Sequence, residues 1–137
     1  MRAITTIGCE GVSPERFDDV LSAARIDVLV DVRADAISRR KGFSSGALAA
    51  RMQATGRTYV RLRDLGRIDE LAQLTAGHRV ALMGYEADAR DCRRSRVAEQ
   101  VADLENLAIL HLRVAKTQEG LNWARSAPGL GEQLVAA

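Results

Sequence analysis

Asp27-Val28-Leu29-Val30-Asp31-Val32 is the clearest structural signal in this chain, because it is a short and largely apolar run bounded by charged residues. Such a composition is typical of a strand buried on both faces of a parallel sheet. Strand and helix patterns alternate on either side of it, with strands predicted at residues 2–7, 27–32, 58–62, 79–83 and 107–112. Parallel strands need crossover connections, so we expect a Rossmann-like α/β fold. The predicted architecture is a three-layer α/β/α sandwich with a mostly parallel five-stranded sheet.

The length of 137 residues predicts one α/β domain over residues 1–137. Its core covers about residues 2–112, and the C-terminal tail, residues 113–137, either docks over the sheet or frays. No apolar run approaches the roughly 18 residues of a membrane span, and the N-terminus lacks the pattern of a signal peptide. We therefore expect a cytoplasmic protein with no membrane partner.

The basic residues are concentrated in one part of the chain, although the net charge is only +2. Residues 33–67 hold nine basic and two acidic side chains, a balance of +7, and the rest holds eleven basic and sixteen acidic ones, a balance of −5. A one-sided field favours phosphates or other polyanions as partners. Eighteen of the twenty basic residues are arginine, so genomic base composition explains the bias equally well.

Two arginine clusters follow predicted strands directly. The first contains Arg33, Arg39 and Arg40, and the second contains Arg94 followed by Ser95. Ligands of alternating strand–helix proteins bind where strands end and helices begin. We therefore expect both clusters to face one anionic ligand, either a small molecule or a nucleic acid.

Asp31 lies two residues before Arg33, at the end of the second predicted strand. A carboxylate there can bond a ribose hydroxyl or form a structural ion pair with an arginine, and both interpretations stay open. Phe43 and Tyr59 are candidates to stack on a base beside the arginines. A buried anchor for the basic loop is the simpler interpretation of Phe43.

The turn Gly8-Cys9-Glu10-Gly11 follows the first predicted strand and precedes a helix that Ser13 and Pro14 begin. Gly8 and Gly11 let the backbone approach a ligand, and helix N-termini attract anions. The spacing lacks the glycine patterns of dinucleotide and triphosphate sites. A plain tight turn is therefore the simpler interpretation, with phosphate binding as the alternative.

Glu86 closely follows the fourth predicted strand, where a carboxylate can serve as a general base or a glycosidic nucleophile. Glu10 and Asp31 are its rivals for that role. The alternative is a carboxylate placed to suit the dipole of the next helix.

Cys92 is a further catalytic candidate, because neighbouring arginines and a helix N-terminus favour a thiolate. Helical spacing from Val97 turns Cys92 away from the core and Arg93 toward the strand ends, unless the helix starts later. A bystander thiol is therefore the simpler interpretation. Histidines and cysteines are few and scattered, and we predict neither a metal site nor a cofactor.

These residues together resemble a family of domains of unknown function, DUF488. The motifs that carry the resemblance run in order from about residue 3 to residue 112: Thr6-Ile7-Gly8 with Glu10-Gly11, Asp31-Val32-Arg33, Ser38-Arg39-Arg40, Gly42-Phe43-Ser44, Tyr59-Val60, Leu65-Gly66, and Glu86 with Cys92 and Arg94-Ser95. The resemblance implies a compact bacterial or archaeal α/β domain with a polar cluster at the strand ends.

Family members usually read Cys-Ala-Glu after the fourth strand and Cys-His-Arg-Ser soon after. Here Gly84 replaces the first of these cysteines and Arg93 replaces the histidine. A two-thiol or Cys/His mechanism is therefore not carried over, whereas Glu86 and Cys92 are retained.

The prediction is a domain that binds a phosphate-containing ligand, a nucleotide or a nucleic acid, at the C-terminal strand ends, where the carboxylates allow hydrolytic or glycosidic activity. One alternative is a thiol enzyme of sulfurtransferase or redox type that uses Cys92. Another is a non-enzymatic scaffold whose arginines form structural ion pairs. The sequence leaves the ligand, the enzymatic activity and the oligomeric state open.

Overall fold

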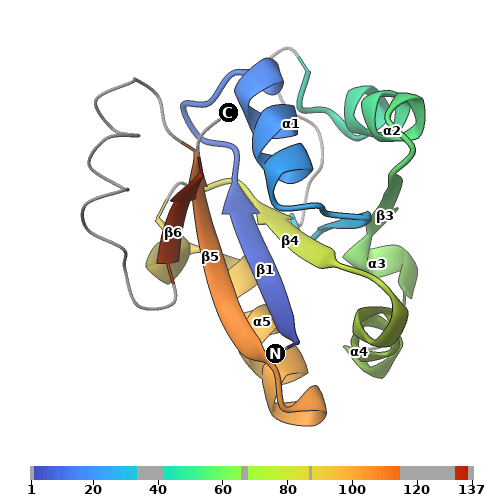
Figure 1. The fold of residues 1–137 in the computed structure, drawn as a ribbon, viewed down its shortest axis with the longest axis vertical. Helices are drawn as coiled ribbons and strands as arrows, with labels where there is room; N and C mark the ends of the chain where they lie inside the picture. The colour runs from blue at the N-terminus through green and yellow to red at the C-terminus, as the bar shows by residue number, and fades with distance from the viewer. Residues whose placement is uncertain (1, 34–41, 66–67, 87, 115–131, 136–137) are drawn as a thin grey trace.

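The protein is described by a computed structural model over residues 2–33, 42–65, 68–86, 88–114 and 132–135. The elements follow one another as β1 (Ala3–Gly8), α1 (Pro14–Ala23), β2 (Val28–Asp31), α2 (Ser45–Ala54), β3 (Thr58–Arg61), α3 (Leu62–Leu65), α4 (Ile68–Gly77), β4 (Val80–Gly84), the 3-10 turn η1 (Ala89–Asp91), α5 (Arg93–Glu105), β5 (Ala108–Val114) and β6 (Glu132–Val135). Figure 1 shows the strands side by side, with helices in front of and behind them.

The strands form one sheet in the order β3-β2-β4-β1-β5-β6, and every pairing is parallel. All five predicted strands are present. The prediction of a five-stranded sheet is corrected by β6, which lies in the predicted tail and pairs with β5 from His111 opposite Glu132 to Val114 opposite Val135. Only the last two residues of β6 are apolar, which is too short a pattern to predict a strand.

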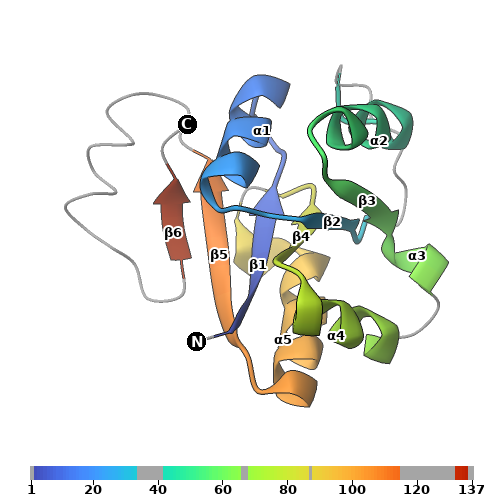
Figure 2. The same cartoon turned by 45° about the vertical axis from the view of Figure 1, so that its right-hand side comes forward.

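Helices cover both faces of the sheet, which confirms the predicted sandwich. On one face, Phe17 of α1 and Leu48 of α2 pack with strand residues that include Leu29. On the other face, Leu71 of α4 and Val97 of α5 pack with the alternate strand residues. Figure 2 shows the same elements after a turn of 45° about the vertical axis.

Two helices, α1 and α2, begin where the sequence supplies side-chain caps. The Ser13 hydroxyl accepts a hydrogen bond from the Arg16 N–H at 3.3 Å, with Pro14 at the first helical position. The Ser44 hydroxyl accepts from the Ala47 N–H in the same way. Among the described residues, no helix is long and apolar enough to cross a membrane.

The helix that follows β4 packs on the opposite face from the helices that follow its two neighbouring strands, and this arrangement positions the site. β4 lies between β1 and β2. The helices that follow β1 and β2 pack on one face, whereas α5, which follows β4, packs on the other. In open α/β sheets such a reversal leaves a crevice at the carboxyl ends of the strands. The loop after β1 and the first residues after β4 border this edge, toward which the arrow of β1 points in Figure 1.

Candidate functional site

The loops after β1 and β4 are joined beyond the ends of the two strands. The Cys9 N–H donates to the Gly84 carbonyl oxygen at 3.2 Å, and the Glu10 N–H donates to the Tyr85 carbonyl oxygen at 2.8 Å. These bonds continue the pairing of β1 with β4 by two residues. The backbone at the centre of the carboxyl edge is therefore held from both sides.

Arg94 supports the same loops from the α5 face. Its side chain is fully buried, and Nη1 donates to the Glu86 carbonyl oxygen at 2.5 Å. A Cβ atom at Gly8 would lie 2.1 Å from that carbonyl oxygen and 3.1 Å from Nη1 of Arg94. Gly8 is thus required by the close approach of two loops. The predicted phosphate contact of Arg94 stays a prediction, and its described contact is structural.

Cys92 packs against Gly84, at the end of β4. Its thiol is 5 % exposed, and a Cβ atom at Gly84 would lie 2.1 Å from Sγ. The expectation that Cys92 points away from the core is wrong. Cys92 is the extended residue that precedes α5, so helical spacing from Val97 does not apply to it. Arg93, expected to lean toward the strand ends, is exposed.

Asp31 is the centre of a buried polar group at the end of β2. It is 1 % exposed and accepts from Nε and Nη2 of Arg33 at 2.9 and 2.7 Å. The Tyr59 hydroxyl donates to the same carboxylate at 2.6 Å. Burial of Tyr59 and its hydrogen bond to Asp31 raise the pKa of the phenol above its ordinary value. Of the two interpretations of Asp31, the structure supports the ion pair.

The two arginine clusters do not meet within the described residues. Asp31 follows Leu29 by two positions, so the group that it forms with Arg33 lies on the face covered by α1 and α2. Arg94 lies on the opposite face, under the ends of β1 and β4. Arg39 and Arg40 lie outside the described residues. The expectation that both clusters face one ligand therefore stays untested for Arg39 and Arg40. The two described arginines of these clusters, Arg33 and Arg94, lie on opposite faces of the sheet.

The two candidate carboxylates border the edge differently. Glu10 is exposed, and Gly11 beside it adopts a left-handed φ of 72°, as a tight turn requires. Glu86 is partly exposed, and no hydrogen bond or ion pair joins its carboxylate to another described side chain. Both lie at the carboxyl edge, which makes them suitable positions for acid–base chemistry.

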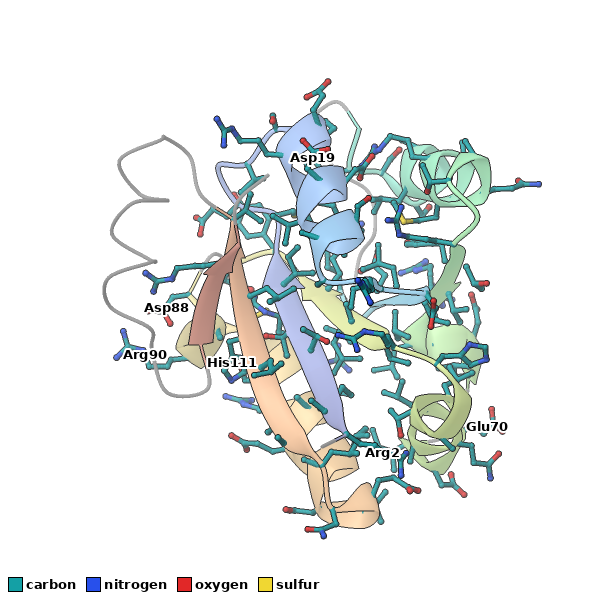
Figure 3. All side chains as sticks on the ribbon, in the orientation of Figure 1. Arg2, Asp19, Glu70, Asp88, Arg90 and His111 are labelled. Atoms are coloured by element: carbon teal, nitrogen blue, oxygen red, sulfur yellow. The ribbon has the colours of Figure 1, made fainter. Side chains whose placement is uncertain are left out.

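Ser95 and the loop before α5 make local structural contacts. The Ser95 hydroxyl donates to the Ala89 carbonyl oxygen, which ties the first turn of α5 to η1. Asp88 and Arg90, both labelled in Figure 3, form an ion pair at 2.9 Å. The hydrogen bonds from Arg90 lower the pKa of Asp88 to about 2. The described contact of Ser95 is again structural, and its ligand contact stays a prediction.

Phe43 is a core residue, as the simpler interpretation holds. It is fully buried, and its ring meets that of Phe17 edge-on at 5.4 Å between centroids. Arg51 lies over the Phe43 ring at 5.7 Å, pairs with Asp18 at 2.8 Å and donates to the Gly42 carbonyl oxygen. The end of the basic loop is thus anchored to α1 and α2.

Tyr85 is the residue that sequence reasoning missed. It is 48 % exposed at the end of β4, between Gly84 and the candidate carboxylate Glu86. The signal in the sequence was an aromatic residue placed directly after a buried strand, between Gly84 and Glu86. Within the described part of the chain, no group of three or more histidine, cysteine, aspartate or glutamate residues could hold a metal ion.

Comparisons with known proteins agree with the fold and the resemblance. The family described as "Domain of unknown function DUF488" matches residues 13–73, which confirms the predicted resemblance. The matched segment includes Asp31, Arg33 and Tyr59 but neither the turn after β1 nor the loop after β4. No curated protein matches the chain.

Among solved structures, a de novo designed protein with a P-loop NTPase fold is similar, with a TM-score of 0.53 and 9 % identity. The similarity covers 98 % of this chain and 82 % of that chain. At this identity it shows the fold alone, and it agrees with the predicted Rossmann-like α/β class.

Proposed function

For a chain whose residues 13–73 match the DUF488 family, we propose that the carboxyl edge of the sheet binds a phosphate-containing ligand, a nucleotide or a nucleic acid. The observation that carries this proposal is the position of β4 between β1 and β2. The helix that follows β4 packs on one face of the sheet, and the helices that follow β1 and β2 pack on the other. Ligands of open α/β sheets bind at such positions.

The charge distribution supports an anionic ligand. The segment of residues 33–67, with its balance of +7, starts at this edge with Arg33. Arg93 adds an exposed cation at the first turn of α5, where the positive end of the helix dipole also lies. Gly8 lets the end of β1 approach the backbone of Glu86, and Gly84 leaves room for the side chain of Cys92 beneath the edge.

Glu86 is the residue best suited to a chemical step on the bound ligand. Its backbone is held by Arg94, and its partly exposed carboxylate makes no bond to another described side chain. A carboxylate on a fixed backbone can activate a water or attack a sugar–base bond. Glu86→Gln should therefore keep ligand binding and remove any hydrolytic or glycosidic turnover.

The thiol alternative is less favoured. Cys92 is 5 % exposed and Cys9 is 2 % exposed, and buried thiols in apolar surroundings are inert. Alkylation of the folded protein by iodoacetamide at neutral pH, read by mass spectrometry, tests this alternative. Rapid labelling of Cys92 in the folded state would favour the thiol enzyme.

Fluorescence anisotropy across a salt series tests the proposed binding. The probes are a labelled nucleotide and labelled single-stranded and duplex oligonucleotides, and the variants are Arg93→Ala and Arg39→Ala/Arg40→Ala. The control is Arg25→Asn, which removes an exposed cation at the amino edge of the sheet and suits its left-handed φ of 57°. We expect affinity to fall with salt and to fall in both test variants but not in the control. Salt-independent binding, or equal affinity in all four proteins, would exclude the proposal.

A further inference from the structure

Tyr85 differs from the other described aromatic residues in its exposure. Phe17 and Phe43 are fully buried and pack against each other. Tyr59 is half-buried and donates its hydroxyl to the carboxylate at the end of β2. Tyr85 is 48 % exposed, and Leu104 is the other large apolar side chain in the described residues that is exposed. An exposed ring at the carboxyl edge therefore calls for an explanation that packing does not give.

The backbone on which Tyr85 stands is fixed at three successive carbonyl groups. Those of Gly84 and Tyr85 accept hydrogen bonds from the loop after β1, at 3.2 and 2.8 Å. That of Glu86 accepts from Nη1 of Arg94 at 2.5 Å. A ring with two rotatable bonds on a fixed backbone loses little conformational freedom on binding. Tyr85 is therefore presented to solvent in a form suited to contact a flat ligand.

The position of Tyr85 places this ring where the proposed ligand binds. It follows β4 directly, and the helix after β4 packs on the opposite face from the helices that follow the neighbouring strands β1 and β2. The next residue, Glu86, is the candidate carboxylate for chemistry on a sugar–base bond. A ligand bound at this edge would therefore meet the exposed ring of Tyr85.

We propose that Tyr85 stacks on a nucleobase, so that the ligand of this edge is recognised by its base as well as by its phosphates. The inference rests on the proposed function and names the ligand class within it. Base–aromatic stacking accepts any base, because every base has a π-face. A single-stranded or free nucleotide offers that face, whereas a duplex keeps its bases stacked inside. The edge should therefore prefer unpaired nucleotides over duplexes.

Fluorescence of 2-aminopurine, a base whose emission falls when it stacks, tests this inference. Two probes carry 2-aminopurine: its nucleoside monophosphate and a single-stranded oligonucleotide. The third probe is a labelled abasic oligonucleotide of equal length, whose binding is measured by fluorescence anisotropy. The variants are Tyr85→Ala, Tyr85→Phe and the control Leu104→Ala. The control removes the other exposed large apolar side chain of the described residues, from the last turn of α5. Circular dichroism confirms that each variant is folded.

We expect Tyr85→Ala to raise the Kd of the base-bearing probes on the order of 10-fold and to remove the quenching. The abasic probe should bind wild type and Tyr85→Ala alike. Tyr85→Phe should behave as wild type because it keeps the ring, and Leu104→Ala should change nothing. Quenching of the mononucleotide would point to a free nucleotide as the source of the base, and quenching of the oligonucleotide alone to a nucleic acid.

The failure of this inference differs from the failure of the proposed function. If Tyr85→Ala binds every probe as wild type does, with salt dependence intact, the stacking role is overturned and the binding edge stands. An equal loss for base-bearing and abasic probes also overturns it. If wild type binds none of the three probes at low salt, both proposals fall.

Discussion

Replacement of Gly84 by alanine should destabilise the protein through one identifiable contact. A Cβ atom at this position lies 2.1 Å from Sγ of Cys92, far below the 3.0 Å under which such contacts are essentially never found. The next atoms, Cδ and Nη1 of Arg94, lie at an ordinary 3.4 Å. Overpacking of a well-packed site typically costs about 1–3 kcal/mol, so we expect Gly84→Ala to lower the free energy of unfolding by about 2 kcal/mol.

Removal of the sulfur should relieve this strain. Cys92→Ala alone leaves a space of one heavy atom and costs about 1 kcal/mol. In the double variant Gly84→Ala/Cys92→Ala, the new methyl group occupies the space that the sulfur leaves. We expect the double variant to lie within about 1 kcal/mol of wild type, so that the coupling energy of the pair is about 2 kcal/mol.

Urea unfolding followed by circular dichroism measures these free energies for wild type, both single variants and the double variant. Gly46→Ala is the matched control, because Gly46 lies in α2 and a Cβ atom there meets nothing within 4 Å. The same substitution should stabilise the protein at that position, by up to about 1 kcal/mol. Alkylation provides a second measurement, because Gly84→Ala should push Cys92 outward and speed its labelling.

The result that would refute this reasoning is additivity. If the loss in Gly84→Ala/Cys92→Ala equals the sum of the two single losses, the sulfur is not what opposes the methyl group. A neutral Gly84→Ala would be equally damaging, because it would mean that Cys92 does not pack against the end of β4.

Three further predictions follow from the described contacts. Gly8→Ala should lower the free energy of unfolding by about 3 kcal/mol, measured by thermal or urea unfolding, because the new Cβ meets the Glu86 carbonyl oxygen at 2.1 Å. Since that oxygen belongs to the backbone, no second side-chain substitution should restore the lost stability, and a rescue of this kind would contradict the geometry. Asp18→Asn should cost about 1 kcal/mol, less in 1 M salt, because the partly exposed pair with Arg51 is screened; a loss that does not change with salt would exclude an electrostatic origin. Tyr59→Phe should cost about 1.5 kcal/mol, because it removes a hydrogen bond to a buried carboxylate. Folding raises the pKa of Tyr59, so the stability that its hydroxyl contributes should be complete below the pKa of the unfolded state, about 10, and should be lost as the pH rises through the pKa of the folded state. The difference between the ultraviolet titrations of wild type and Tyr59→Phe measures the ionisation of Tyr59, which should occur above pH 10.

The fold could be predicted from the sequence to a large extent, because each central element carries its own pattern. The apolar run at residues 27–32 and the caps at Ser13 and Pro14 act within a few residues of themselves, so local reasoning finds them. β6 lacks such a pattern, because only two of its four residues are apolar. Its pairing with β5 is a contact between distant segments, which local reasoning does not reach.

The candidate site was predictable as a location but only partly as an arrangement. Strand ends are visible in the sequence, so Asp31 and Glu86 were correctly placed at the carboxyl edge. The face on which a side chain lies also depends on where a helix starts. Cys92 caps α5 from outside the helix, and helical spacing therefore misplaced it. Arg94 is fully buried although it is charged, and a hydrophobic pattern does not predict such a residue.

The division of the arginines between structural and exposed positions decides how the protein should respond to their loss. Arg33 is paired with a buried carboxylate, and Arg94 holds the backbone of the loop after β4. Arg33→Ala should therefore lower Tm, because it leaves the carboxylate of Asp31 buried without a cation beside it. Arg93 is exposed, so Arg93→Ala should leave Tm unchanged.

The salt dependence of binding then separates a binding edge from a structural scaffold. Each phosphate neutralised contributes about 0.7–0.9 to the slope of log affinity against log salt. If the edge binds phosphate, Arg93→Ala should reduce that slope by about one unit at unchanged Tm. If the chain is a scaffold whose arginines serve only stability, no arginine substitution should alter the slope, because no ligand releases counterions. The slope measured for Arg93→Ala therefore distinguishes the two roles, because the lower Tm of Arg33→Ala is expected in both cases.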